Sequence, residues 1–315
     1  MLASAGQTRL DRTIDSQYKP RPARHFSQSL SLLRMTMSKQ ENILTIDVED
    51  LDATNLLPRD DPRRHNLPSR VCGNMDVLLD VLAAHDARAT MFFLGTVAER
   101  HPQLVRRAQA AGHEIASHGY AHELVYSQTR SQFHDDVKKS VEILQAITGS
   151  PLRGYRAPSW SISKDTPWAY EVLVELGFEY DASLFPFHTF LYGDSQAPVS
   201  TFVRMVGNRS LYEVPASVVT ICGRRIPFGG GFYLRAMPYF VTRWATFLTN
   251  RSGRPAMFYI HPREIDPDQP RFDLPWRDRF IAYANLGTTL RKLEKVLCLG
   301  PTISIQEHLR TYQNA

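Results

Sequence analysis

The sequence predicts an α/β fold built on a parallel sheet with crossover helices. Short apolar, β-favouring runs alternate along the chain with segments whose apolar residues recur at helical spacing. Several polar residues directly follow a predicted strand, and the ends of parallel strands are where α/β folds build their sites. These residues are Asp47, His118, Arg156 and His261. The length of 315 residues is enough for one closed α/β barrel formed as a single domain.

The strands are predicted from their β-favouring composition and from the turn residues around them. They cover residues 43–46, 89–94, 114–116, 178–180, 211–214 and 257–260, and one more precedes Arg156. The predicted helices cover residues 74–85, 102–111, 131–148, 167–176, 238–248, 278–286 and 288–296. Gly112, Gly149 and Gly177 stand directly after three helices, at the position where glycine commonly ends a helix.

Residues 1–38 are polar, basic and without apolar periodicity. We therefore expect a disordered tail, followed by one barrel domain of residues 39–315. Two alternatives stay open. The native start lies at Met35 or Met37, or the segment is a basic arm with a function of its own.

The net charge of +5 comes from the N-terminal segment. Residues 1–39 hold seven basic and two acidic residues, and the remainder holds 30 of each sign. A neutral globular body lacks the broad positive surface of a nucleic-acid-binding protein. We therefore expect no nucleic-acid partner.

The three cysteines, Cys72, Cys222 and Cys298, are odd in number and form no CxxC pair, which favours reduced thiols over disulfides. The longest apolar stretch, around residues 89–94, is far shorter than the roughly 20 residues of a membrane helix. The N-terminus also lacks the apolar core of a signal peptide. These observations predict a cytoplasmic protein without a transmembrane segment.

A pair of histidines is the first candidate for a metal site. His118 and His122 are four residues apart, and on a helical or turn-like segment this spacing puts both imidazoles on one face. There they can share a cation. The alternative is two unrelated surface histidines.

Three carboxylates end the first strand: Asp47, Glu49 and Asp50. Clustered like charges repel one another unless a metal ion or an arginine compensates them. Carboxylates two residues apart on a strand can supply one metal ligand and one free base. A solvated acidic turn is the alternative.

Arg156 ends another strand, where its guanidinium can hold a carboxylate in a two-pronged arrangement. Trp160 follows shortly afterwards and offers an apolar face suited to a sugar ring; an ordinary loop with a core tryptophan is the alternative. His261 follows the strand 257–260. A histidine there is either simply hydrogen-bonded or, if a pocket lies above it, catalytic.

The order of these motifs along residues 43–308 resembles the polysaccharide deacetylases of the NodB-homology group, also called carbohydrate esterase family 4. The acidic strand end, the HxxxH pair, Arg-x-Pro and the strand-end histidine all occur in the family's order. The run 227–233 and the phrase His261-Pro-Arg-Glu resemble the subgroup found with bacterial exosortase and exopolysaccharide loci. The resemblance implies a distorted (β/α) barrel with fewer than eight clean units.

The resemblance also implies a role for each motif. Asp47 is the general base, His261 is the general acid, and Arg156 orients Asp47. One divalent metal ion, zinc by expectation, is held by His118, His122 and one carboxylate. The backbone near Ser159 contributes to an oxyanion hole, with Trp160 and Asp181 as further substrate or oxyanion residues.

The chain departs from the family pattern at three places. The usual adjacent aspartates are here Asp47-Val-Glu-Asp50, so the third metal ligand is open. Glu49 is favoured because a two-residue offset returns the side chain to the same side of an extended segment, and Asp50 is the alternative. Ser159 stands where the family has tyrosine, and the motif around Asp181, which in the family orients the acid histidine, matches only loosely.

The implied activity is removal of N-acetyl groups from an amino sugar in a polysaccharide or glycan precursor, with release of acetate. Because we expect a cytoplasmic protein, a lipid-linked or nucleotide-linked sugar is the expected acceptor. Two other functions stay open. One is hydrolysis of another small amide on the same barrel, and the other is glycan binding without catalysis.

Overall fold

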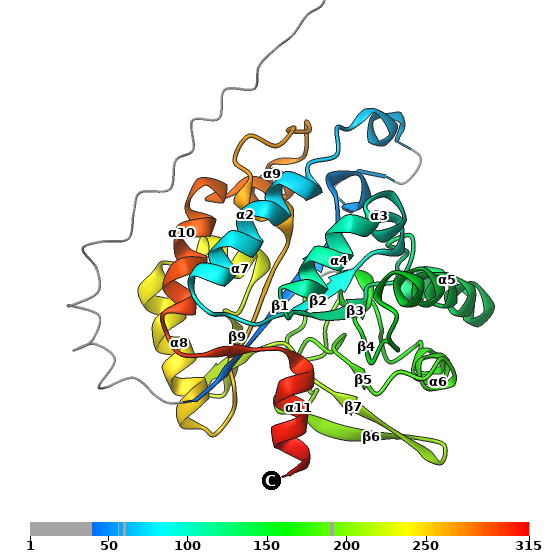
Figure 1. Ribbon diagram of the computed structural model, residues 1–315. Coiled ribbons are helices and arrows are strands. Elements are labelled where there is room, and N and C mark those ends of the chain that lie inside the picture. Colours follow the sequence, from blue (N-terminus) through cyan, green and yellow to red (C-terminus); the bar gives the residue numbers. More distant parts are fainter. Residues whose placement is uncertain (1–39, 56, 59–60, 190–191, 315) are drawn as a thin grey trace, which may run out of the picture. The chain divides into compact units, whose positions relative to one another are not determined.

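The structure is a computed structural model that describes residues 40–55, 57–58, 61–189 and 192–314 (Figure 1). The predicted tail, residues 1–38, and the boundary of the barrel domain after it therefore lie outside the described residues. The described chain forms one mixed α/β domain around a parallel sheet, which confirms the predicted fold class. No described helix is both long and apolar enough to cross a membrane.

The central sheet has nine strands in the described part of the chain. Eight are parallel to one another: seven in the order β10-β1-β2-β3-β4-β5-β7, and the short β11, which pairs with the start of β1. The ninth, β6, is antiparallel at the edge. The bounds are β1 Asn42–Val48, β2 Thr90–Phe93, β3 Glu114–Ser117, β4 Gly154–Tyr155, β5 Tyr180–Asp181, β6 Phe202–Val206, β7 Arg209–Glu213, β10 Met257–Ile260 and β11 Thr302–Ile303. A separate hairpin pairs β8 (Val218–Ile221) with β9 (Arg224–Pro227).

Each predicted helix is present, with ends shifted by a few residues. The helices are α2 Val71–Ala84, α3 Gly95–Arg100, α4 Pro102–Ala110, α5 Arg130–Thr148, α6 Trp168–Glu175, α7 Gly231–Ala236, α8 Tyr239–Arg251, α9 Trp276–Tyr283, α10 Leu286–Leu297 and α11 Ile305–Gln313. Helix α5 shows how local sequence sets the ends. A capping box of Thr129 and Gln132 begins it, and Gly149 ends it in the left-handed conformation at φ 67°. The sequence did not predict α3, α7 and α11.

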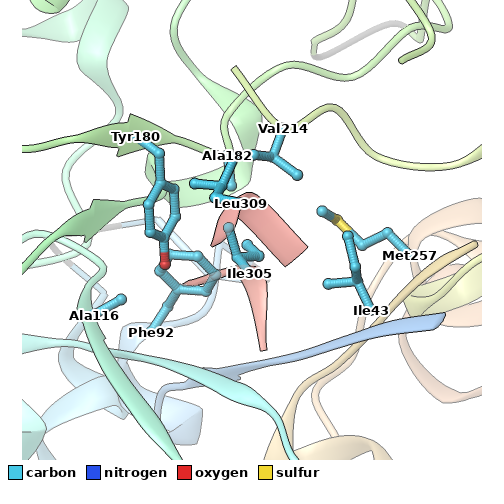
Figure 2. Packing of buried hydrophobic residues seen from close by; sticks show 9 residues of the cluster. All are labelled: Ile43, Phe92, Ala116, Tyr180, Ala182, Val214, Met257, Ile305 and Leu309. Atoms are coloured by element: carbon cyan, nitrogen blue, oxygen red, sulfur yellow. The ribbon is translucent and has the colours of Figure 1, made fainter. Parts of the chain in front are cut away.

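The sheet rolls into a distorted barrel. One buried cluster gathers side chains from β1, β2, β3, β5 and β10 and from the segment after β7, which only a rolled sheet can bring together (Figure 2). Its members are Ile43, Phe92, Ala116, Tyr180, Ala182, Val214, Met257, Ile305 and Leu309. Among the described strands no ladder joins β7 to β10; instead, the Met257 N–H donates to Ser217 Oγ at 2.6 Å.

Helix α11 packs against the barrel core through Ile305 and Leu309 (Figure 2). Its first turn is held by Glu114, a half-buried glutamate at the start of β3. Glu114 Oε2 accepts from Thr90 Oγ1 at 2.6 Å and from the Gln306 N–H at 3.0 Å, and Oε1 accepts from Tyr180 Oη at 2.8 Å. Burial raises the pKa of Glu114, although these hydrogen bonds partly oppose it.

We expect Glu114→Gln to be tolerated at acidic pH and to stabilise the protein at alkaline pH. The raised folded-state pKa means that Glu114 adds stability below its ordinary pKa of 4.5, and that this stability is lost as pH rises through the folded value. Glutamine cannot ionise, and its amide group can donate to the Tyr180 oxygen in place of the present bond. Melting temperatures of both proteins from pH 5 to pH 9 check this, and a variant disadvantage that grows with pH would contradict it.

Candidate active site

Strand β1 places the catalytic candidate Asp47 in the interior of the barrel. The strand runs two residues further than predicted, so Asp47 lies within it and is 3% exposed. Thr45 and Asp47 are two residues apart and share one side of the strand. One nitrogen of Arg156 therefore reaches both side chains: Nη1 donates to Thr45 Oγ1 at 2.8 Å and to Asp47 Oδ1 at 2.6 Å.

Arg156 is fully buried, and its surroundings compensate its charge. It follows the two-residue strand β4 and faces β1 across the barrel. The guanidinium lies 4.3 Å from the ring centre of Phe92 and 4.7 Å from that of Trp160, so it also makes cation–π contacts. An arginine held at this many points fixes the orientation of the Asp47 carboxylate.

Glu49, His118 and His122 come together as a buried group with metal-ligand chemistry, their ligand atoms within 4.8 Å of one another. The Glu49 Oε2 and His122 Nε2 atoms are 2.8 Å apart. The His118 Nδ1–H donates to the Arg156 carbonyl at 2.8 Å, so Nε2 is the nitrogen that would bind a metal ion. One carboxylate and two imidazoles match the donor set of a divalent ion of zinc type and leave a coordination position open.

The charges within this group fit metal binding. Burial acts to raise the pKa of Glu49, but the imidazoles of His122 and His261 and the guanidinium of Arg263 hold it well below the usual range. Burial lowers the pKa of His118 to about 4. A carboxylate and a neutral imidazole are the protonation states that bind metal.

The two histidines do not lie on a helix, which corrects the helical option of the sequence analysis. Residues 118–122 form a turn after β3, with positive φ at Gly119 (76°) and His122 (59°). The Asp136 carboxylate accepts the N–H groups of Tyr120 and Ala121 at 2.8 and 3.0 Å. Asp136, which was not predicted from the sequence, thus holds the turn in a shape that brings both imidazoles to the group.

Asp50 lies apart from the metal-type group, because it caps the short helix Leu51–Ala53. Its Oδ1 accepts from the Leu51 N–H at 2.8 Å and from the Arg70 N–H at 3.2 Å. Glu49 rather than Asp50 therefore has the geometry of the third ligand.

His261 directly follows β10, the neighbour of β1 in the sheet, and so lies close to the acidic end of β1. Its Nε2 lies 3.7 Å from Asp47 Oδ2 and 3.9 Å from Glu49 Oε1. On the other side of the ring, Nδ1 lies 3.1 Å from Glu264 Oε2, which also accepts the His261 N–H at 3.0 Å. Burial alone would lower the pKa of His261, but the Glu264 hydrogen bond and the nearby carboxylates raise it.

Glu264 is in turn held by Arg235, whose Nε donates to Glu264 Oε1 at 2.7 Å. Both side chains of this pair are 2% exposed. Arg235 also donates to the carbonyl groups of Ile281 and Ala284, which ties the pair to α9. His261, which is half-buried, and the buried residues Glu264 and Arg235 thus form a connected chain, whose last two members were not predicted from the sequence.

Ser159 and Trp160 lie beside Arg156 in a strained turn, both with positive φ, at 50° and 55°. Backbone in this region is costly for residues other than glycine and is often found at functional sites. The Asn55 side chain donates to Ser159 Oγ at 2.7 Å. Trp160 is 6% exposed and packs on Phe185, so it lies mostly in the core rather than on an open surface.

Asp181 is not brought to His261, since no hydrogen bond or ion pair joins them among the described residues. Its carboxylate accepts from the Ser183 N–H at 3.0 Å and from Ser183 Oγ at 2.5 Å. Ser183 Oγ in turn accepts the Ala157 N–H at 2.7 Å, so Asp181 supports the turn that carries Ser159. Glu264, and not Asp181, contacts the His261 ring.

The fold and the site define a class: an α/β protein whose strand ends bring a group with metal-ligand chemistry next to the close pair Asp47 and His261. Residues 70–180 match the model of the family described as Polysaccharide deacetylase, and residues 182–307 match a family described as Domain of unknown function (DUF3473). Residues 70–180, about a third of the chain, therefore carry the match to the polysaccharide deacetylases.

The chain is similar to a peptidoglycan deacetylase of Helicobacter pylori, at 37% identity over 107 residues, which is 34% of this chain and 36% of the relative. It is 33% identical over 95 residues to a peptidoglycan-N-acetylglucosamine deacetylase of Bacillus cereus, covering 30% of this chain and 34% of the relative. The match thus spans about a third of the length of these relatives. A solved structure of a candidate polysaccharide deacetylase from Mycobacterium smegmatis shares the fold, with a TM-score of 0.54 at 20% identity, over 88% of this chain and 96% of that one.

Proposed function

We propose that the protein is a metal-dependent hydrolase that removes the N-acetyl group from an N-acetylated amino sugar. The observation that carries the proposal is the meeting of Asp47 and His261, 3.7 Å apart, next to the group Glu49, His118 and His122. A base, an acid and three metal donors in one place are the parts that amide hydrolysis requires. The family match to polysaccharide deacetylases supports the choice of an acetamido sugar.

In the proposed reaction, Asp47 takes a proton from the water that attacks the acetamide carbonyl carbon. His261 then gives a proton to the sugar nitrogen as the C–N bond breaks, which leaves acetate and a free amine. The Ser159 N–H makes no hydrogen bond to any described residue and is our candidate donor to the oxyanion. A divalent ion held by Glu49, His118 and His122 would polarise the carbonyl and increase the acidity of the water. Zinc is the ion we propose, since it prefers nitrogen and oxygen ligands of this kind.

A polar groove near the site, lined by none of the site residues themselves, is the proposed place for further units of a glycan, which a small cyclic amide would not need. Its volume is about 270 Å³, and it reaches from Asp52 past Arg100 to Ala121, next to His122. The second alternative, a binding protein without catalysis, has no need for the paired Asp47 and His261. The pair therefore supports catalysis over binding alone.

We further propose a cytoplasmic enzyme of exopolysaccharide biosynthesis that acts on a lipid-linked or nucleotide-linked sugar. The three cysteines are free thiols, which fits a reducing compartment. The run 227–233 and the phrase His261-Pro-Arg-Glu264 support the exosortase-associated subgroup.

Acetate release from a panel of N-acetylated substrates tests the function. We expect release from N-acetylglucosamine oligomers or lipid-linked N-acetylated sugars after loading with zinc, and none from the chelated protein. Release from small cyclic amides alone would favour the first alternative. Glycan binding without any release would favour the second.

We expect Glu264→Gln to lower kcat about ten-fold or more with little change in KM, as loss of part of the general-acid contribution would. Both carboxylate oxygens of Glu264 accept hydrogen bonds, one set from His261 and one from Arg235. Glutamine has only one accepting oxygen, so its amide group must face a donor on one side. Kinetics of the metal-loaded variant check this, and Glu264→Asp, which keeps the charge, should recover part of the loss. An unchanged kcat in Glu264→Gln would remove Glu264 from the positioning of His261.

A further inference from the structure

Helix α8 (Tyr239–Arg251) has an inverted distribution of polarity. Its buried face carries small and polar residues: Thr242, Ala245, Thr246, Thr249 and Asn250. Its solvent side carries three large aromatic residues, Phe240, Trp244 and Phe247, which are 72%, 47% and 55% exposed. Their spacing of four and three residues puts them on one face, which we call the aromatic face of α8. A soluble helix normally has the opposite arrangement, so exposed aromatic residues on this scale indicate an interaction surface.

The segment of chain that carries the aromatic face is purely positive in its sequence. Residues 214–263 contain no aspartate, glutamate or lysine but seven arginines: Arg224, Arg225, Arg235, Arg243, Arg251, Arg254 and Arg263. Arg243 and Arg251 are exposed and fall on the same side of α8 as the aromatic residues. Aromatic side chains flanked by arginine are the composition of helices that lie in the interface of an anionic bilayer.

Charge also distinguishes the partners that could cover the aromatic face of α8: residues 1–39, a second copy of the chain or an anionic surface. Residues 1–39 carry seven basic residues against two acidic ones, so they repel an arginine-bearing surface. A second copy of the chain, related by a two-fold axis, would bring Arg243 and Arg251 against the same two residues of its neighbour. An anionic surface has neither problem.

We propose that the aromatic face of α8 docks the protein on an anionic lipid bilayer. Phe240, Trp244 and Phe247 enter the boundary between headgroups and acyl chains, while Arg243 and Arg251 bind lipid phosphates. The helix lies along the bilayer and does not cross it. This proposal holds whether or not the protein is a deacetylase, because it uses none of the residues of the candidate active site.

Tryptophan fluorescence of the full-length chain tests the proposal. Vesicles of phosphatidylcholine and phosphatidylglycerol with brominated acyl chains quench tryptophans that reach the acyl region. The measurement is made at about 0.5 M salt, where charge attraction by residues 1–39 is screened over a few ångströms. We expect quenching in the wild type and its loss in Trp244→Phe. Trp276→Phe is the matched control, since Trp276 on α9 is 73% exposed and should leave quenching intact.

A triple variant, Phe240→Ser with Trp244→Ser and Phe247→Ser, should bind these vesicles at least about ten-fold more weakly than the wild type. Replacing phosphatidylglycerol by phosphatidylcholine should weaken wild-type binding. Quenching that is lost in Trp276→Phe but kept in Trp244→Phe would move the contact to α9 and overturn the proposal. So would a wild-type dimer, seen by sedimentation without lipid, that the triple variant dissociates. Equal binding of wild type and a correctly folded triple variant would also overturn it.

Discussion

Replacing Asp47 with asparagine is expected to lower turnover about a hundred-fold or more while leaving bound metal nearly unchanged. The loss follows from removal of the general base, whose contribution typically lies between about 10² and 10⁴. Metal should stay because Glu49, His118 and His122, and not Asp47, form the metal-type group. The asparagine oxygen can still accept from Arg156, so the position of the side chain is kept. Steady-state kinetics and elemental analysis of the same preparation check both parts.

The matched control for Asp47→Asn is Asp50→Asn, which changes a carboxylate three residues away that caps a short helix. It should keep turnover within a few-fold. His261→Ala should resemble Asp47→Asn in kinetics and metal content, and the double variant should be little worse than either single one, since residues that act as a unit are not additive. Wild-type turnover in metal-loaded Asp47→Asn would refute the assignment of the base.

The second large effect is expected from the double variant His118→Ala with His122→Ala, which should lose the metal and all measurable activity. Two of the three donors disappear, and a single buried carboxylate cannot hold a divalent ion tightly. Glu49→Ala should also lose most of the metal. Asp50→Ala should keep it, because Asp50 is outside the group of three residues whose ligand atoms lie within 4.8 Å of one another. Elemental analysis after dialysis without chelator gives the metal content.

Equal metal content in the wild type and the double histidine variant would refute the metal site itself. A reversed order of Glu49→Ala and Asp50→Ala would leave the site in place but give the third position to Asp50. Thermal melting of each apoprotein separates loss of ligands from loss of fold.

The sequence predicted the parts of this fold that have strong periodicity and clear boundaries. Strand β10 has the predicted bounds, and α5 begins within one residue of its prediction, because an apolar run and a capping box are local signals. The short helices α3 and α7 were missed because six residues are too few to repeat the apolar spacing of a helix. The hairpin β8–β9 was missed because its strands of four residues, in part exposed, show no clear alternation.

The residues of the candidate site likewise fall into those that a local pattern predicts and those that only the three-dimensional structure reveals. Residues that end strands were found because topology alone brings strand ends together. Glu264 was missed although a signal exists: with His261 before Pro262, it stands in the spacing of a capping box. Asp136 lies in the middle of α5 and acts on the turn 118–122 only in three dimensions, so no local pattern could reveal it.

Arg156 acts at both of its ends. Its guanidinium donates to Asp47, and its carbonyl oxygen accepts from the Nδ1–H of His118, so a single residue directly after β4 connects the proposed base with a proposed metal ligand. A displacement of either partner is therefore transmitted to the other through a rigid, buried connection. If metal binding improves the alignment of Asp47 for substrate, then substrate must tighten the metal by the same factor, because coupling between two equilibria is reciprocal. In such a protein the metal ion binds more tightly when substrate is bound, and a metal titration without substrate underestimates the affinity that holds during turnover.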